Sequence, residues 1–451
     1  MKRTTKALAA VAGAVLGAGS LSTYGWAQGG HSRQAEALPA PAGLTLDAQF
    51  GQFGREAYAP RSGQLVVDWN KELVKIEQTP GAQPATIHPT RSYALLQTAI
   101  YDAVVSITQA DDPYAFSVVA PRPARADAAA DQAAHDVLTK LFPTFSSQLD
   151  TLLSSELGSI PAGAAKDSGL VVGARTATLL LALRANDGST TPPPPFKAGN
   201  QPGDYQLTPP NAAQAQFTGW GNTTPWVLTT GDQFRPPAPP LLSSAQWAAA
   251  INQVESLGQD TSTTRTPDQT TIAQFWAPPI WNTWNEIAES QAIQHRSSLE
   301  QASHVFAALD LSLADTAVGF YDAKYHYQLW RPVTAIRAGT PGNSLVNPPN
   351  TSWLPQAHTT APDPSYPAAH ATESEAAATV LSEFYGDQPL TVSSDALSGT
   401  TRSFNSFQAA ANEAGLSRIF AGQHTSIDVN AGDVLGHQIA DFVLSQPFGS
   451  P

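Results

Sequence analysis

Three short blocks in the C-terminal third of the chain hold the side chains best suited to chemistry. Lys324 is followed seven residues later by Arg331, His370 comes directly after a proline-rich loop, and Arg418 is followed six residues later by His424. Together they supply three positive charges and two imidazoles. Such a set suits an anion with several oxygens, because charge-assisted hydrogen bonds are stronger than neutral ones.

Helix ends are expected to position the first block. Lys324 and Arg331, seven residues apart, fall within roughly 20° of each other around a helix. Pro332 disfavours helical geometry at the residue before it, so Arg331 is predicted at the helix end. Two surface cations are the alternative, although the neighbouring aromatic Trp330 favours burial.

The other two blocks are also expected at helix boundaries. Ala369 and His370 precede an alanine-rich segment with a helical pattern, so their N–H groups would lie at a helix N-terminus, where anions bind. A capping or surface role for this histidine is the alternative. Gly422 can break the helix before His424. Asp428, one turn further on, is expected to orient that imidazole.

Composition predicts a globular protein. The 451 residues are 14% charged and 42% hydrophobic, with a formal net charge of −13 and no cysteine. This length permits a substantial core. The acidic surface argues against binding to nucleic acid or anionic lipid, and the absence of cysteine excludes thiolate chemistry.

The N-terminus predicts export. Lys2, Arg3 and Lys6 precede an apolar run that ends near Leu21, and this run is shorter than the roughly 20 residues that span a bilayer. We therefore expect residues 1–27 to be a removed signal peptide, with a membrane anchor as the alternative. The mature protein would be secreted or periplasmic, without a membrane attachment.

The chain is predicted to be mainly α, with two packed helical bundles and the active site in the C-terminal one. We expect an N-terminal arm or linker at 28–62, a helical bundle at 63–190, an ordered Pro/Gly-rich connection at 191–243, and a second bundle with the oxyanion site at 244–451. No convincing strand pattern is found. Helical patterns are expected from Arg91 to Val104 and at about 126–141, 144–157, 164–186, 244–256, 266–275, 283–294, 296–330, 371–385 and 426–445.

The three blocks resemble the signature shared by vanadium-dependent haloperoxidases and type 2 phosphatidic acid phosphatases, which reads Lys-x6-Arg-Pro, Pro-Ser-Gly-His and Ser-Arg-x5-His-x3-Asp. The matching positions here are Lys324, Arg331, Pro332, Pro367, His370, Ser417, Arg418, His424 and Asp428. Trp330-Arg331-Pro332 and the segment from Thr230 to Pro236 look like bacterial haloperoxidases in particular.

The resemblance implies vanadate, with vanadium(V), as cofactor, and hydrogen peroxide, a halide and a small organic acceptor as partners. By the same resemblance His424 would bond the metal and His370 would act as the acid or base. Lys324, Arg331, Arg418 and the N–H of Ala369 would hold the vanadate oxygens. In the phosphatase branch His424 would instead attack phosphorus and form a phosphohistidine.

Four positions depart from the family pattern. Ala368 and Ala369 replace Ser-Gly, which removes a hydroxyl that would bond the anion. Asp363 stands where chloride oxidisers carry an aromatic residue, and Tyr321 replaces an expected tryptophan. A carboxylate near a halide would repel it, so bromide or iodide is favoured over chloride. An exported acid phosphatase and a non-catalytic oxyanion-binding protein are the alternatives.

Other polar residues fit structural roles. His304, His326 and His437 lie in helical patterns without ligand partners and are expected to pack or to face solvent. His358 lies in the loop before the second block and can approach the mouth of the site. Asp268 is expected early in a helix, favoured by the helix dipole, with pairing to Arg418 as an alternative.

Overall fold

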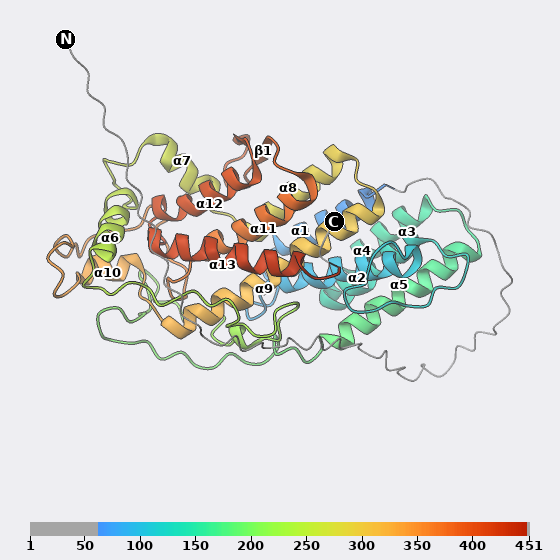
Figure 1. Cartoon of the computed structure of the whole chain (residues 1–451), viewed down its shortest axis with the longest axis horizontal. Coiled ribbons are helices and arrows are strands. Elements are labelled where there is room, and N and C mark those ends of the chain that lie inside the picture. The colour runs from blue at the N-terminus through green and yellow to red at the C-terminus, as the bar shows by residue number, and fades with distance from the viewer. Residues whose placement is uncertain (1–61, 449–451) are drawn as a thin grey trace, which may run out of the picture. The chain divides into compact units, whose positions relative to one another are not determined.

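The computed structural model describes residues 62–448, which form a predominantly helical protein (Figure 1). The predicted signal peptide and nearly all of the predicted arm therefore lie outside the described residues. Within residues 62–448, no helix has both the length and the apolar character needed to cross a membrane.

The first helices of the chain pack together around α2 and α3. The bounds are α1 Gln64–Glu77, α2 Thr90–Thr108, α3 Ala126–Leu141, α4 Ser146–Gly158 and α5 Ala164–Leu183, with a short 3-10 turn, η1, at Pro143–Phe145. A long irregular segment follows, interrupted by a second 3-10 turn, η2, at Trp220–Asn222 that packs against α9. Its aromatic side chains Trp220 and Trp226 are buried, which explains why a segment rich in Pro and Gly is ordered.

The remaining elements carry the three blocks. Their bounds are α6 Ala245–Leu257, α7 Pro267–Phe275, α8 Ile280–His295, α9 Leu299–Tyr327, α10 Pro332–Ala338, α11 Ala369–Tyr385, β1 Leu390–Ser393, β2 Thr401–Phe404, α12 Phe407–Phe420 and α13 Ser426–Leu444. The predicted mainly α fold is confirmed. The predicted domain boundaries stay a prediction.

Helix α9 is the centre of this arrangement. It starts at a capping box, in which Ser298 and Gln301 satisfy each other's backbone N–H groups. Its residues are buried on nearly every face because α2, α11 and α13 all pack against it. The helix ends at Tyr327, where Gln328 adopts a left-handed conformation with φ 47°. Lys324 in its last turn is therefore held inside the protein.

Helices α11 and α13 lie side by side and bring the second and third blocks together (Figure 1). Two glycines of α13 allow this approach. A Cβ at Gly432 would lie 2.7 Å from the carbonyl oxygen of Ala368, and a Cβ at Gly436 would lie 2.1 Å from that of Thr372. The backbone of α13 can therefore contact the first turn of α11, where His370 lies.

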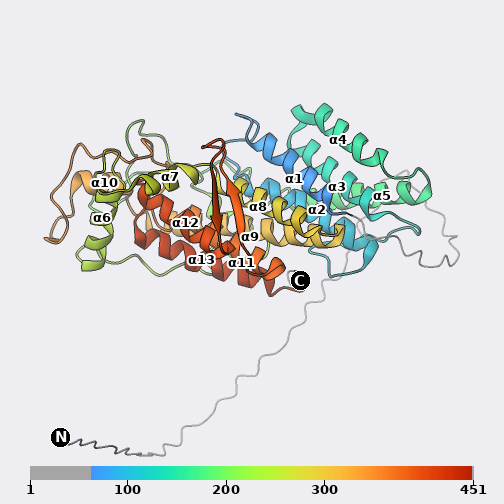
Figure 2. The same ribbon diagram turned by 90° about the horizontal axis from the view of Figure 1, so that it is seen from above.

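The expectation that the chain has no strands was wrong. β1 and β2 form an antiparallel hairpin in which Leu390 lies opposite Phe404. The hairpin lies beside α12 (Figure 2). Each strand has four residues, and β2 is exposed or half-buried throughout, so no long alternating apolar pattern marks it. Helices α1, α10 and α12 were also not predicted individually, and α9 ends three residues earlier than expected.

Candidate oxyanion-binding site

Five side chains from the three blocks meet in one place, which we call the oxyanion cradle: Lys324, Arg331, His370, Arg418 and His424. The pKa of His424 is well below its ordinary value, first because of burial and then because of the positive charges of Arg331, Lys324 and Arg418 and the nearby His370. Arg331 Nη1 lies 3.0 Å from His424 Nε2, and Arg331 and Lys324 both donate to Asp363 Oδ1. Arg418 and His370 are near enough for their electrostatic effect to reach His424. The structure therefore brings together the cations and imidazoles that the sequence analysis selected.

The first block is built differently from the prediction. Arg331 does not share a helix face with Lys324, because α9 ends at Tyr327 and Arg331 caps the start of α10 with φ −80° and ψ 155°. Both side chains are almost fully buried. Pro332 sets this boundary by opening α10 rather than by closing α9.

Both cations of the first block contact the Asp363 carboxylate. Lys324 Nζ donates to Asp363 Oδ1 at 2.9 Å, and the Arg331 guanidinium donates to the same oxygen. Burial alone would raise the pKa of Asp363, but the charges of Lys324 and Arg331 outweigh this and lower it. Burial lowers the pKa of Lys324 to about 8, against the attraction of Asp363. Asp363 is thus a direct partner of the cations, and its charge is compensated by them. Its expected effect on halide stays a prediction.

His424 presents Nε2 to the cradle. Arg331 Nη1 lies 3.0 Å from Nε2, and because a guanidinium only donates hydrogen bonds, this nitrogen accepts and the neutral ring carries its proton on Nδ1. The Nδ1 side lies 3.6 Å from Asp428 Oδ2 and 3.5 Å from Ser365 Oγ. The predicted orienting role of Asp428 is consistent with this geometry.

Asp428 is itself held by the start of α13. Its Oδ2 accepts from the Thr425 backbone N–H at 2.7 Å and from Ser365 Oγ at 2.8 Å. Burial raises the pKa of Asp428, opposed by these hydrogen bonds. The capping box of α13 therefore fixes the carboxylate that faces His424, and Gly422 at φ 75° makes the turn between α12 and α13 that places the imidazole.

The accessible side of the cradle carries buried donors without partners. Arg418 and His370 are partly exposed, yet Arg418 Nε and His370 Nε2 are enclosed and make no hydrogen bond. Burial lowers the pKa of His370 well below its ordinary value, and Arg418 adds to this effect. Ala369 and His370 open α11, so their N–H groups also lack intrahelical acceptors.

Two residues near the cradle escaped the sequence analysis. Ser365, in the proline-rich loop, bonds Asp428 and approaches His424, a contact across about sixty residues that no local pattern reveals. His88 precedes α2 and is buried among aromatic rings that include Tyr321, at a ring-centroid distance of 5.7 Å. Burial lowers the pKa of His88 to about 3, against the charge of Asp363. It is thus a neutral ring close to that carboxylate.

Tyr321 lies one turn before Lys324 on α9 and is buried. Its pKa is well above the ordinary value because of burial and then the charge of Asp363. It therefore remains a neutral phenol beside the Asp363 ion pairs, consistent with its predicted place near the site.

Several other expectations are resolved. Asp268 does lie in the first turn of α7, but it pairs with Arg402 at 2.9 Å and not with Arg418, because the β2 strand brings Arg402 to that helix. His304 packs in the interior and bonds the Phe448 carbonyl oxygen, as a structural histidine would. His437 is largely exposed on α13.

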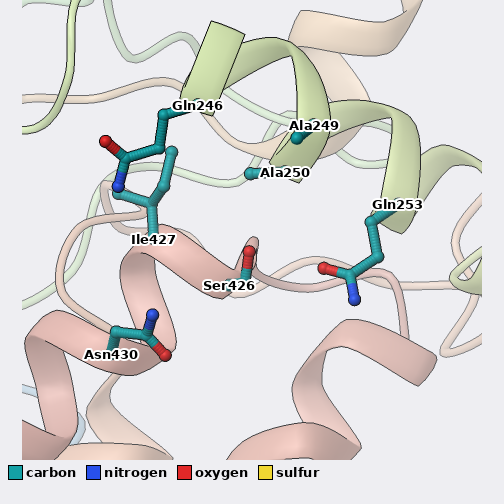
Figure 3. Close-up of a pocket in the computed structure, with 7 residues that line it drawn as sticks. All are labelled: Gln246, Ala249, Ala250, Gln253, Ser426, Ile427 and Asn430. Carbon is teal, nitrogen blue, oxygen red and sulfur yellow. The ribbon is translucent and has the colours of Figure 1, made fainter. Parts of the chain in front are cut away.

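A separate hollow lies beside the N-terminus of α13. It has a volume of about 460 Å³ between α6 and α13 (Figure 3). Neutral side chains line it: Gln246, Ala249, Ala250, Gln253, Ser426, Ile427 and Asn430. With no cation in its wall, this hollow lacks the charge that the cradle offers an anion.

The donors of the cradle fit vanadate. Its enclosed but unpartnered donors, Arg418 Nε and His370 Nε2, are what a bound oxyanion would satisfy. His424 Nε2 is the unprotonated nitrogen that a metal requires. Within residues 62–448, no cluster of three or more His, Asp or Glu forms a metal-cation site. The enclosed cradle atoms and His424 Nε2 together suit a metal held through its oxygens and one histidine.

Comparison with known proteins shows which family the C-terminal helices resemble. Residues 304–447 match the family model described as the VCPO second helical-bundle domain. This segment runs from α9 to α13 and includes the whole cradle. Residues 304–447 are therefore similar to that second helical-bundle domain, and the resemblance read from the sequence is confirmed.

Individual proteins with similar sequences or structures are also vanadium-dependent haloperoxidases. Vanadium chloroperoxidase of Curvularia inaequalis is 25% identical over 199 residues, which are 37% of this chain and 32% of that protein. A bacterial vanadium-dependent iodoperoxidase has a TM-score of 0.71 at 23% identity, covering 86% of this chain and 98% of the other. A holo-type bacterial vanadium-dependent chloroperoxidase has a TM-score of 0.62 at 15% identity, with the same two coverages. These likenesses show a shared fold.

Proposed function

We propose that this protein is a vanadate-dependent peroxidase that oxidises bromide or iodide with hydrogen peroxide and passes the oxidised halogen to a small organic acceptor. The observation that carries the proposal is the convergence of three cations and two imidazoles, with Arg418 Nε and His370 Nε2 enclosed and unpartnered. A bound oxyanion would supply the hydrogen-bond partners that these atoms lack. The match to the VCPO second helical-bundle domain supports vanadate as that oxyanion.

In this proposal each residue has a defined task. His424 Nε2 holds the metal, while Asp428 and Ser365 keep the proton of that ring on Nδ1. Lys324, Arg331, Arg418 and the N–H of Ala369 neutralise and hold the oxygens. When bound, vanadate would supply a Lewis acid that activates hydrogen peroxide.

His370 is proposed as the acid or base. Its ring is neutral because burial and Arg418 lower its pKa. Nε2 therefore accepts a proton in the tautomer that carries the ring proton on Nδ1, and donates one in the tautomer that carries it on Nε2. This nitrogen has no partner, and the residue is partly exposed on the accessible side of the cradle. It is therefore free to take a proton from an incoming molecule.

The charge balance supports bromide or iodide over chloride. Chloride is the hardest of the three halides to oxidise and needs the most electron-poor oxidant. Asp363 keeps a negative charge beside Lys324 and Arg331, even where an oxyanion replaces its direct contacts with them, so the cradle withdraws less electron density from a bound oxyanion than three cations alone would.

The functional test is turnover after reconstitution. Wild-type protein incubated with orthovanadate should oxidise iodide or bromide with hydrogen peroxide, and His424→Ala should lose this activity. His437→Ala is the matched control, because it removes an exposed histidine from α13 and should retain turnover. Phosphomonoester hydrolysis that vanadate inhibits, without halide oxidation, would instead support a phosphatase.

We also propose export, on the basis of Lys2, Arg3 and Lys6 followed by an apolar run. The mature protein recovered from culture medium or periplasm should begin near residue 28. Retention inside the cell with an intact N-terminus would contradict export and leave the enzymatic proposal unaffected.

A further inference from the structure

Two of the three cradle cations already have an anionic partner. Asp363 Oδ1 accepts from Lys324 Nζ at 2.9 Å and also from the Arg331 guanidinium. All three side chains are buried, with exposures of 8% for Asp363, 0% for Lys324 and 1% for Arg331. Arg418 differs from this pair, because among residues 62–448 no carboxylate pairs with it and its Nε makes no hydrogen bond.

The backbone around Asp363 is anchored to the same two cations. Arg331 Nε donates to the carbonyl oxygen of Asp363 at 2.7 Å, and Lys324 Nζ donates to that of Pro364 at 2.5 Å. Ser365 N–H also donates to the Leu329 carbonyl at 2.9 Å. The loop can therefore stay in place while the carboxylate alone turns away about its own side-chain bonds.

We infer that Asp363 is an internal counter-ion, which occupies the anion-binding side of Lys324 and Arg331 and which an incoming oxyanion must displace. The inference rests on the proposed oxyanion site and adds a residue that sets its affinity. An oxygen of the ligand and Asp363 Oδ1 would compete for the same N–H donors, since Lys324 Nζ and the Arg331 guanidinium each have few donors directed into the cradle.

This arrangement has an energetic logic. Without a carboxylate, three buried or half-buried cations would face one another, and burying an uncompensated charge is strongly unfavourable. Asp363 removes most of that penalty in the empty protein. The same interaction opposes ligand binding, because its loss must be subtracted from what the new anion gains. Asp363 therefore increases the stability of the ligand-free protein and decreases its affinity for an anion.

The first test compares phosphate binding by calorimetry in the wild type and Asp363→Asn. The amide keeps the size of the side chain and removes its charge, so we expect phosphate to bind on the order of ten- to a hundredfold more tightly. Asp322→Asn is the matched control. Asp322, on α9, also pairs with an arginine, since it accepts from Arg235 at 2.6 Å. This pair lies outside the cradle, so the substitution should leave the phosphate affinity unchanged.

The possible results separate the two ideas. If the wild type binds phosphate and Asp363→Asn binds it equally or more weakly, Asp363 is not a competitor, although the oxyanion site stands. If neither protein binds phosphate or orthovanadate, the oxyanion site and the inference both fail.

A second measurement needs no variant. In a crystal structure of the wild type with orthovanadate, Asp363 Oδ1 should no longer contact both Lys324 Nζ and the Arg331 guanidinium. Persistence of both contacts beside a bound oxyanion would overturn the inference, whatever the folding behaviour of Asp363→Asn.

Discussion

Replacing Arg418 by methionine should stabilise the empty protein and weaken its hold on anions. Burial lowers the pKa of Arg418 from its ordinary value to about 10, and the charge of Arg331 adds to this. Folding therefore disfavours the charged form by about 3 kcal/mol, at 1.36 kcal/mol per pKa unit. Arg418 lies in the last turn of α12, where its positive charge gains about 0.3–1 kcal/mol from the helix dipole. Methionine loses this smaller favourable contribution.

The net expectation for Arg418→Met is an unfolding free energy about 2 kcal/mol higher than that of the wild type in the absence of ligand. Because both values of the pKa lie well above neutrality, this difference should be constant from about pH 5 to about pH 8. Loss of one charge-assisted contact, worth about 1.5–3 kcal/mol, should weaken phosphate binding about ten- to a hundredfold.

Urea denaturation with and without phosphate measures both quantities. Arg402→Met provides the contrast. Arg402 donates to Glu413 at 2.6 and 2.8 Å and to Asp268 at 2.9 Å, so its loss should destabilise the fold and leave phosphate binding unchanged. Equal destabilisation by both substitutions, or wild-type affinity in Arg418→Met, would refute the view of Arg418 as a cation that lacks its anion.

Three further substitutions test the supporting structure. Gly422→Ala should destabilise the protein by about 3 kcal/mol and weaken phosphate binding, because φ is +75° and the new Cβ would lie 2.5 Å from the Gly258 carbonyl oxygen. The control Gly399→Ala, at φ +77° with open space around it, should lose only about 1 kcal/mol of stability in a thermal melt. Equal losses of stability in the two variants would contradict the steric reasoning. Burial raises the pKa of Asp310 to about 8, so the folded protein holds a proton that the unfolded chain releases between about pH 4 and about pH 8, and stability should fall as pH rises through this window. Asp310→Asn should flatten that fall by up to about 1.4 kcal/mol per pH unit in urea titrations, and an unchanged slope would contradict a protonated Asp310. Ala368→Ser restores the hydroxyl of the family pattern and should tighten phosphate binding severalfold by calorimetry, whereas unchanged affinity would mean that this hydroxyl does not reach the anion.

The sequence was sufficient to select the cradle because its residues carry local signals. The Arg331-Pro332 pair marks a helix boundary, Gly422 marks the turn before His424, and Asp428 follows one helical turn later. These features depend on interactions between near neighbours in the chain, which spacing and residue type reveal. The long apolar pattern of α9 was visible for the same reason.

The partners of the cradle residues could not be read in this way. Asp363 contacts Lys324 across 39 residues, and the shared-face reasoning for Lys324 and Arg331 was wrong because α9 ends before Arg331. Ser365 and His88 reach the site only through tertiary packing. The β1–β2 hairpin escaped detection because its strands are short and largely polar on their exposed faces.

The most direct test of the cradle is a crystal structure of the wild type with orthovanadate. We expect the metal at His424 Nε2, with the vanadate oxygens bonded by Arg418 and by the first N–H groups of α11. Vanadate bound instead in the hollow between α6 and α13 (Figure 3), or elsewhere with His424 free, would contradict the assignment of this site.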